Sequence, residues 1–442
     1  MDGWQIETGN RPGSGAPRRP LGVHMAEWLV VLVILTSFYV RSEPGQDKPS
    51  PYDLMMAGTV GLCFLLGLRF PRRIGWPAAL WGLVVAGFGI GAMDALYVER
   101  VRPAMMTTIY LVGTFLFFAS WIYADPMRRL TQIFWAYTAS ATLAAAFGIA
   151  GYFGLVPGAE IFTQYGRAMG TFNDPNVFGP FLVAPILFLG WRLSTAQSLR
   201  SFWIAFPFGL LVLALLLSFS RGAWGNLLFS GLVFFGLTLA TSKSYLQTMR
   251  LVGFGALTVV VMMGVVGFAL SSPKVANLFE ERASLVQSYD TDPEYGRFES
   301  QSRAFAMALE KPLGLGPAQW AMINRLDTHN VYLNILVAGG FLSGFAFIAL
   351  MLVTLVRGWR AIGRESPAQG LLIVVYAAFA GHIAEAFIID IDNWRHFYLI
   401  VGTLWGLVLA VEERGEVRRT VPDAASRPPQ GIGRAPVSGF QA

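Results

Sequence analysis

The sequence predicts an all-α, polytopic integral membrane protein, and two observations support this. Of its 442 residues, 54% are hydrophobic and only 14% are charged, which departs strongly from the composition of soluble domains. Apolar runs of spanning length recur along nearly the whole chain. Lipid accommodates α-helices because they bond all their backbone polar groups internally.

Length and apolarity predict about 12 transmembrane helices and one large loop. The expected spans are 26–41, 53–69, 74–93, 103–123, 130–154, 177–193, 202–219, 222–241, 250–270, 330–356, 368–389 and 395–411. The chain then divides into a tail (1–25), nine spans (26–270), a large loop with amphipathic helices (271–329), three spans (330–411) and a disordered tail (412–442).

The distribution of Lys and Arg predicts the orientation. Every second connection is rich in cations, namely 69–73, 128–129, 192–200, 243–250 and 357–364. Such loops remain on the cytoplasmic side, so both termini are expected in the cytoplasm. The net charge of +6 is explained by this orientation, and no nucleic-acid partner is expected.

This topology places three polar connections together on the outer face: 165–176, 218–224 and 271–329. In the third, residues 280–287 and 297–311 are expected to be helical and 289–295 irregular. Phe298, Phe305, Ala306 and Leu309 recur at i, i+3/i+4 spacing, which places them on one helix face. The pattern predicts an amphipathic helix that lies on the membrane beside a site entrance.

Several motifs in these connections carry a family resemblance. Gly-Thr-Phe-Asn-Asp-Pro-Asn precedes one span, Ser-Phe-Ser-Arg-Gly-Ala joins two spans, and Arg303 is followed by Pro-Leu-Gly-Leu-Gly and His-Asn-Val-Tyr. In this order the chain, over about residues 160–345, resembles the O-antigen ligase and polysaccharide polymerase superfamily.

The resemblance implies a helical membrane glycosyltransferase of a bacterial inner membrane, with its active site facing the periplasm. Its donor would be a glycan on undecaprenyl pyrophosphate, and its acceptor a hydroxyl of lipid A core or of a growing glycan. It implies no cofactor, nucleotide sugar or metal. The residues to which it assigns catalysis are Arg221, Arg303 and His329.

The chemistry supports these residue types independently. Displacing a pyrophosphate from an anomeric carbon leaves negative charge on phosphate oxygens, which the forked donors of arginine can bind. A sugar hydroxyl is a weak nucleophile and needs a base that works near neutral pH, which favours histidine. We therefore expect Arg221 and Arg303 to bind the pyrophosphate and His329 to accept the proton, with inversion at the anomeric carbon.

Each of these residues also has a structural interpretation. Arg221 could extend from a helix start towards the membrane surface, Arg303 could be a solvated charge, and His329 could be an ordinary interfacial histidine. Arg167 is a further candidate for phosphate binding or simply a surface charge.

Three asparagines precede predicted spans. Asn173 and Asn330 are candidates for sugar binding, while Asn176, and with less weight Asn173, is expected to cap the helix that follows.

His382 and Glu385 lie at i, i+3 within the span 368–389. Ionisable residues inside a membrane are functional candidates, so this pair either binds the acceptor or forms a buried network that fixes helix packing. The polar residues that follow, Asp390, Asp392, Trp394 and Arg395, are expected to be interfacial anchors and not catalytic groups.

The rival function is a secondary transporter or a lipid-linked-glycan flippase, since about twelve spans also suit a transporter. Transporters keep their binding groups near the bilayer midplane, often in repeated halves. Here the span centres carry almost no charge and the polar residues gather at the outer surface, which favours the enzyme. The choice between ligase and polymerase stays open, as do the sugars and the oligomeric state.

Overall fold

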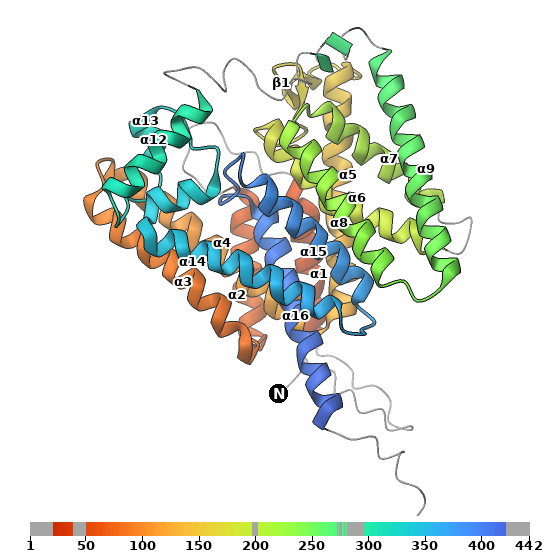
Figure 1. Cartoon of the computed structure of the whole chain (residues 1–442), viewed down its shortest axis with the longest axis horizontal. Coiled ribbons are helices and arrows are strands. Elements are labelled where there is room, and N and C mark those ends of the chain that lie inside the picture. The colour runs from red at the N-terminus through yellow and green to blue at the C-terminus, as the bar shows by residue number, and fades with distance from the viewer. Residues whose placement is uncertain are drawn as a thin grey trace, which may run out of the picture.

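The computed structural model describes residues 21–38, 50–196, 202–271 and 296–420, together with 273, 276, 277, 279 and 280. Helices dominate this part of the chain (Figure 1). The long helices are α1 (Leu21–Leu35), α2 (Pro51–Leu65), α3 (Gly75–Gly91), α4 (Val98–Ala124), α5 (Pro126–Phe153), α6 (Pro175–Ser194), α7 (Phe202–Leu217), α8 (Arg221–Ala240), α9 (Tyr245–Leu270), α14 (Val331–Ile362), α15 (Gln369–Glu385) and α16 (Arg395–Thr420).

Shorter elements occupy the connections. They are the 3-10 turns η1 (Thr36–Phe38), η2 (Arg72–Ile74), η3 (Ala92–Asp94) and η4 (Ala159–Phe162), the antiparallel strands β1 (Thr163–Gln164) and β2 (Arg167–Ala168), and the helices α12 (Arg297–Glu310) and α13 (Trp320–Asn324). In the strand pair Thr163 lies opposite Ala168 and Gln164 opposite Arg167.

The fold is that of an all-α membrane protein. Seven helices of the described residues are long and apolar enough to cross a membrane. They are the segment Arg72–Asp94, which combines η2, α3 and η3, and the helices α4, α5, α6, α8, α14 and α16. Four shorter apolar helices, α1, α2, α7 and α15, overlap expected spans, and α9 overlaps the span expected at 250–270. The total of 12 spans stays a prediction, as do the domain boundaries. The expected helix at 280–287 lies outside the described residues apart from Glu280.

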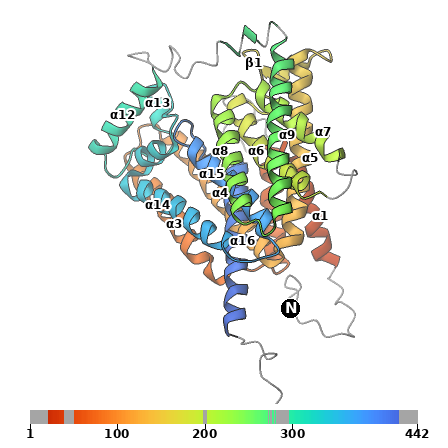
Figure 2. The same cartoon turned by 45° about the vertical axis from the view of Figure 1, so that its right-hand side comes forward.

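The bundle has two distinct ends (Figures 1 and 2). One, here called the terminal end, carries the start of α1 and the end of α16. The other, here called the loop end, carries the β1–β2 hairpin, α12 and α13, and the residues 218–220, 325–330 and 386–394 between long helices. The described parts of the three connections that the sequence assigns to one face therefore lie at one end of the molecule.

Polar caps begin several of the helices at the loop end. Ser50, Asp174, Ser220 and Asn330 each accept a hydrogen bond from the first turn of α2, α6, α8 and α14 respectively. The first N–H groups of a helix have no partner within it, so an oxygen at this position stabilises the helix by roughly 1 kcal/mol. These caps fix where each helix leaves the loops that bear the candidate residues.

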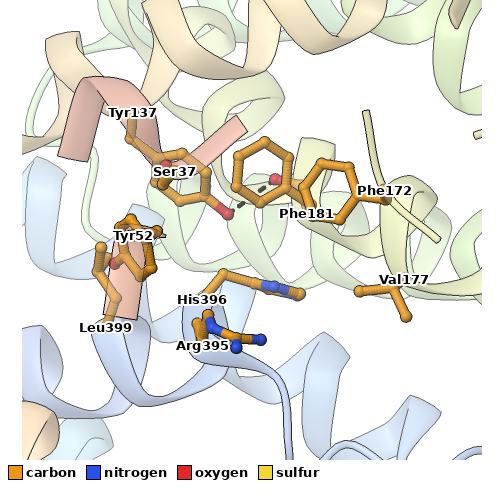
Figure 3. Close-up of a pocket in the computed structure, with 9 residues that line it drawn as sticks. All are labelled: Ser37, Tyr52, Tyr137, Phe172, Val177, Phe181, Arg395, His396 and Leu399. Atoms are coloured by element: carbon orange, nitrogen blue, oxygen red, sulfur yellow. Dashed lines mark hydrogen bonds between the residues drawn. The ribbon is translucent and has the colours of Figure 1, made fainter. Parts of the chain in front are cut away.

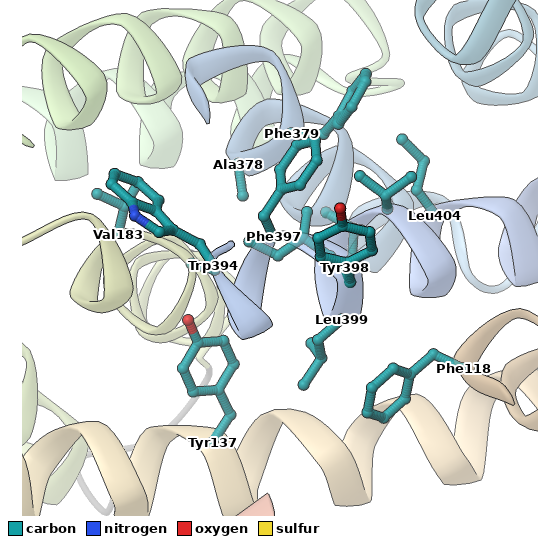
Figure 4. Packing of buried hydrophobic residues seen from close by; sticks show 14 of the residues in the cluster. Phe118, Tyr137, Val183, Ala378, Phe379, Trp394, Phe397, Tyr398, Leu399 and Leu404 are labelled. Atoms are coloured by element: carbon teal, nitrogen blue, oxygen red, sulfur yellow. The ribbon is translucent and has the colours of Figure 1, made fainter. Parts of the chain in front are cut away.

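The core is packed with aromatic and branched side chains from α16, α5, α6 and α15 (Figure 4). Tyr137, Phe397 and Tyr398 are almost completely buried there. Helix α16 packs along α4, α15 along α8, and α14 along α3. The turns that follow α15 and precede α14 and α16 are thus carried on closely packed helices.

A break in α14 anchors the connection from α12. Gly339 and Gly340 leave helical geometry, with φ of +65° at Gly340. Within this break, Phe341 N donates to the Pro312 carbonyl at 3.0 Å and Leu315 N donates to the Val337 carbonyl at 2.9 Å. A Cβ at position 340 would lie 2.2 Å from the Pro312 oxygen, so glycine is required on both conformational and steric grounds.

Candidate functional site

His329 lies in a turn that one carboxylate organises. Asp390 Oδ2 accepts from the backbone N–H of His329 at 2.9 Å, and its Oδ1 accepts from Asn330 N and from the Thr328 hydroxyl, each at 2.9 Å. His329 itself has φ of +47°. Non-glycine residues in this conformation are uncommon, persist only where their surroundings hold them, and cluster at functional sites.

The imidazole of His329 is left available by this arrangement. Both backbone polar groups of His329 are hydrogen-bonded, the N–H to Asp390 and the carbonyl to Gln301 Nε2 at 3.3 Å. No described residue is hydrogen-bonded to the ring, and the residue is half-buried. The strained backbone therefore places a titratable side chain at the loop end without committing it to a structural bond.

Helix α12 brings Arg303 to the same region. Besides the bond from Gln301 to His329, Ser300 Oγ donates to the Asp327 carbonyl at 3.2 Å, so α12 contacts the turn at two points. Arg303 follows on this helix, is exposed, and pairs with Glu299 at 3.8 Å.

The expected amphipathic character of α12 is evident in its burial. Its small residues Ala304 and Ala308 are buried, whereas Phe298, Phe305 and Leu309 are about half-exposed, at 48%, 53% and 58%. An apolar stripe thus remains uncovered on the described surface.

Arg221 begins α8, directly after the turn at 218–220. Phe219 in this turn has φ of +46°, and Ser220 Oγ accepts from Ala223 N at 3.3 Å. The neighbouring Gly222 lies against α15, because a Cβ there would be 2.8 Å from Glu385 Oε1 and 3.5 Å from Ile388. The segment from Glu385 to Asp390 therefore connects the start of α8 to the His329 turn.

Arg167 is a buried structural link. Its Nε donates to the Ser218 carbonyl at 2.8 Å and its guanidinium donates to Asn176 Oδ1 at 2.7 Å. It thus ties the β1–β2 hairpin to the turn before Arg221 and to the start of α6. The phosphate contact expected of it stays a prediction.

The helix cap predicted at Asn176 is wrong. Asp174 caps α6, and its Oδ1 accepts from the Asn176 backbone at 2.8 Å. Asn176 is instead occupied by Arg167, and the sequence order Asp-Pro-Asn gave no sign of that distant partner. Asn173 is exposed. Asn330 does cap α14, accepting from Tyr332 N and Leu333 N at 3.1 and 3.2 Å; sugar binding by Asn173 and Asn330 stays a prediction.

His382 and Glu385 are buried between helices. Glu385 Oε2 accepts from Asn226 Nδ2 of α8 at 2.7 Å, and Ser230 donates to Asn226 at 2.9 Å. His382 Nδ1 lies 2.7 Å from the Ala378 carbonyl, and its ring lies 5.3 Å from that of His396. These contacts favour the packing interpretation of the pair, and binding of an acceptor by it stays a prediction.

The residues between α15 and α16 do more than anchor the chain at the interface. Burial raises the pKa of Asp390 and, together with the charge of Asp390, the pKa of Asp392. Asp392 Oδ2 accepts from Asn334 at 3.1 Å. Sequence reasoning missed the role of Asp390, because its three partners lie some 60 positions away in the chain.

Sequence reasoning also missed an ion pair that joins α2 to α16. Arg395 donates through Nε and a terminal nitrogen to the two carboxylate oxygens of Asp53 at 2.6 and 2.5 Å. Both residues lie at the outer ends of expected spans. Ionisable residues in membrane-spanning segments are functional candidates, so Asp53 and Arg395 could have been identified as candidates from the sequence.

Two cavities adjoin Arg395. The smaller, about 40 Å³, is lined by Tyr52, Tyr137, Phe181 and His396 among others (Figure 3). Its volume suits one or two water molecules. The larger, about 1240 Å³, lies between α2, α4, α13, α14 and α16 and includes Asp327, Asn334 and Asp392 in its wall. In volume it exceeds the usual pocket for a small molecule.

No cluster of three or more His, Cys, Asp or Glu side chains suited to a metal ion occurs among the described residues. The metal-independent reaction and the lack of a cofactor stay predictions.

A comparison with protein families gives a match to part of the chain. Residues 206–348 match the family model described as O-Antigen ligase. No curated protein matches the sequence. The matched part includes Arg221, Arg303, His329 and Asn330, whereas Arg167, Asn173, His382 and Glu385 lie outside it. The resemblance to the O-antigen ligase superfamily is therefore confirmed, over residues 206–348, which supports a membrane glycosyltransferase of the O-antigen ligase or polymerase type.

Proposed function

We propose that this protein transfers a glycan from undecaprenyl pyrophosphate to an acceptor hydroxyl at its loop end. The observation that carries the proposal is the His329 turn, which Asp390 holds in a left-handed conformation. Elements bearing Arg303 and Arg221 adjoin this turn from two sides, through Gln301 and through the segment 385–390. A base on a turn that is linked to two arginine-bearing helices suits pyrophosphate displacement.

The arginines would stabilise the leaving group. Negative charge grows on the phosphate oxygens as the bond to the anomeric carbon breaks, and fixed donors are most effective where charge develops. Arginine keeps its charge and offers two parallel N–H donors to phosphate oxygens. Arg221, at the first position of α8, also adds to a helix N-terminus, which itself favours anions.

His329 would act as the general base. Its imidazole takes the proton from the acceptor hydroxyl while the hydroxyl oxygen attacks the anomeric carbon. One C–O bond forms, the C–O bond to the pyrophosphate breaks, and the lipid pyrophosphate departs with the electron pair. A single displacement of this kind inverts the anomeric centre.

The orientation follows from the cations at the terminal end. Arg128, Arg357 and Arg414 lie at or near helix ends there, and cationic loops remain in the cytoplasm. The loop end then faces the periplasm of a bacterial inner membrane, where the lipid-linked donor and the lipid A core or growing glycan would meet. Both termini are cytoplasmic in this arrangement.

Helix α12 would lie on the membrane surface beside the site. Its uncovered Phe298, Phe305 and Leu309 suit the boundary between acyl chains and headgroups. Arg303 on the same helix then stands at the level of the phosphates, where the pyrophosphate of a membrane-embedded polyprenyl lipid resides.

The test is a gel of lipopolysaccharide and of lipid-linked glycan from a deletion strain. It would carry the wild-type chain, His329→Ala, or the control His24→Ala, which changes an exposed histidine of α1. Loss of long chains from lipid A in His329→Ala, with polymer accumulating on its lipid carrier, identifies a ligase. Glycan stalled at single repeat units identifies a polymerase. Unchanged profiles in the deletion strain itself would overturn the proposal and favour the transporter alternative.

A further inference from the structure

The large cavity at the loop end is not used by the proposed donor chemistry. It measures about 1240 Å³ and lies between the outer parts of α2, α4, α14 and α16, with α13 at its rim. Among the described residues that line it, neither Arg221 nor Arg303 appears. A cavity of this volume at the outer ends of the helices has room for several sugar rings.

The wall of this cavity is continuous with the His329 turn. Asp327, two residues before His329, and Asn334, on the first turn of α14, both line it. So does Asp392, two residues after the carboxylate that holds His329. A molecule in the cavity would thus lie next to the turn that presents the imidazole, on a side distinct from α8.

The charges in the wall do not suit a pyrophosphate. Arg395 is matched by Asp53 through two hydrogen bonds, so it contributes little net charge. The remaining lining charges are mixed, since Arg100 and Arg102 line the cavity together with Glu99, Asp327 and Asp392. A diphosphate would meet three carboxylates there.

The same wall suits a molecule rich in hydroxyl groups. Asp392 uses Oδ2 for Asn334, while its Oδ1 is buried and has no hydrogen-bond partner among the described residues. A buried acceptor without a partner is unfavourable by about 1–3 kcal/mol, and a hydroxyl donor would remove that penalty. Asn334, Asn393 and Trp320 add amide groups and an aromatic ring.

We propose that this cavity binds the acceptor saccharide, with Asp392 and Asn334 bonding its hydroxyl groups beside the His329 turn. This rests on the proposed function, because it divides the two substrates of that reaction. The donor pyrophosphate lies on the side of Arg221 and Arg303, the acceptor lies in the cavity, and the imidazole stands between them. Asp392 is then a residue that binds and positions the acceptor.

The first experiment fills the cavity. Thr107→Trp places a large ring on a cavity-lining position of α4, and Ile109→Trp is its matched control, because Ile109 is 54% exposed and does not line the cavity. The full-length protein in detergent is examined by saturation-transfer NMR with an oligosaccharide released from the host's own lipopolysaccharide. We expect binding to wild type, to Ile109→Trp and to His329→Ala, and loss of binding in Thr107→Trp. Unchanged binding in Thr107→Trp would overturn the proposal.

The second experiment separates the acceptor from the donor. In two-substrate kinetics, Asp392→Asn should raise the KM for the acceptor about tenfold, which corresponds to one lost hydrogen bond of about 1.4 kcal/mol, and leave the donor KM unchanged. A rise in the donor KM alone would contradict the assignment. If binding depends on Thr107 as expected but no transfer is detected, the proposed reaction fails and the saccharide cavity stands, since the NMR readout needs no turnover.

Discussion

The two ends of this helix bundle use buried charge in opposite ways. At the terminal end, Glu27 binds Arg128 at 2.6 Å, and the fully buried Arg129 lies 3.8 Å from Glu27 and 4.0 Å from the Trp121 ring centroid. Arg357 likewise pairs with Glu412 and lies over Trp405 at 4.9 Å. These contacts join α1 to α5 and α14 to α16.

At the loop end, buried carboxylates instead hydrogen-bond to turns between helices. Asp390 binds the backbone of the His329 turn, and Asp392 keeps one oxygen without a partner beside a cavity of about 1240 Å³. Ion pairs occur at both ends, as in Asp53–Arg395 at the loop end, but the described loop end also carries the cavity and the strained His329 turn. Under the proposed function, the comparison assigns chemistry to the loop end and stability to the terminal end.

The largest expected effect on stability comes from Glu27→Ala at the terminal end. It removes the carboxylate that lies 3.8 Å from Arg129, whose side-chain exposure is 0%, and breaking a buried ion pair costs about 3–5 kcal/mol. Asp53→Ala at the loop end should cost less, because Arg395 is 29% exposed and can be hydrated from the cavity. Thermal unfolding in detergent would check the order, and a larger loss in Asp53→Ala would break the comparison.

Arginine-to-lysine changes should affect turnover at one end only. Arg221→Lys and Arg303→Lys keep the charge but lose the forked donors, so we expect turnover to fall roughly 100-fold, about 2.7 kcal/mol of transition-state stabilisation. The matched change Arg128→Lys at the terminal end should leave turnover per folded molecule unchanged. Initial rates with a saturating lipid-linked donor measure both. Full activity in the two loop-end variants would remove the pyrophosphate role from these arginines.

A smaller effect is expected from Asp390→Asn. The amide nitrogen that replaces Oδ2 would face the His329 N–H as a second donor, so one buried donor loses its acceptor at a cost of about 1–3 kcal/mol. Hydrogen exchange at residues 328–330 should accelerate and transfer should fall with it. Asp94→Asn, which changes an exposed carboxylate, serves as the control, and equal exchange in the two variants would contradict the role given to Asp390.

The smallest effect concerns pH. Burial raises the pKa of Asp390 and Asp392 above the ordinary value of 3.8, so the folded chain holds these protons to higher pH than the unfolded chain does. The folded state then binds more protons, and the free energy of unfolding falls as pH rises from about 4 towards the raised values. Asp392→Asn should flatten this fall in unfolding midpoints measured across pH. If the unfolding midpoint of Asp392→Asn changed with pH as steeply as that of the wild type, the raised pKa of Asp392 would be contradicted.

Much of the fold could be predicted, because membrane helices satisfy their own backbone and depend little on distant partners. The apolar runs locate the helices, and the expected 297–311 helix agrees with α12 to within one residue. The predicted helix ends are less accurate: α14 extends to Ile362, beyond the expected 356, and Arg357 in this last part of the helix pairs with Glu412 of α16. Such pairing depends on tertiary contacts.

The candidate site likewise has a part that the sequence predicts and a part that it does not. Local motifs around His329 and Arg221 identify turns at helix starts, because caps and tight turns are encoded within a few residues. The partners of these turns could not be predicted, since Asp390, Arg395 and Arg167 act across 51 to 342 positions of sequence. The cavity is lined by residues from several helices at once and therefore has no local sequence pattern.

The most direct test of the central claim is transfer by the purified protein in proteoliposomes. A fluorescent glycan on undecaprenyl pyrophosphate would be the donor, and the host's lipid A core or lipid-linked repeat unit would be the acceptor. We predict transfer by the wild type and by His24→Ala, and a loss of at least roughly 100-fold in His329→Ala, as expected for a general base. Full transfer by His329→Ala, with an unchanged dependence on pH, would contradict the assignment of the chemistry to the loop end.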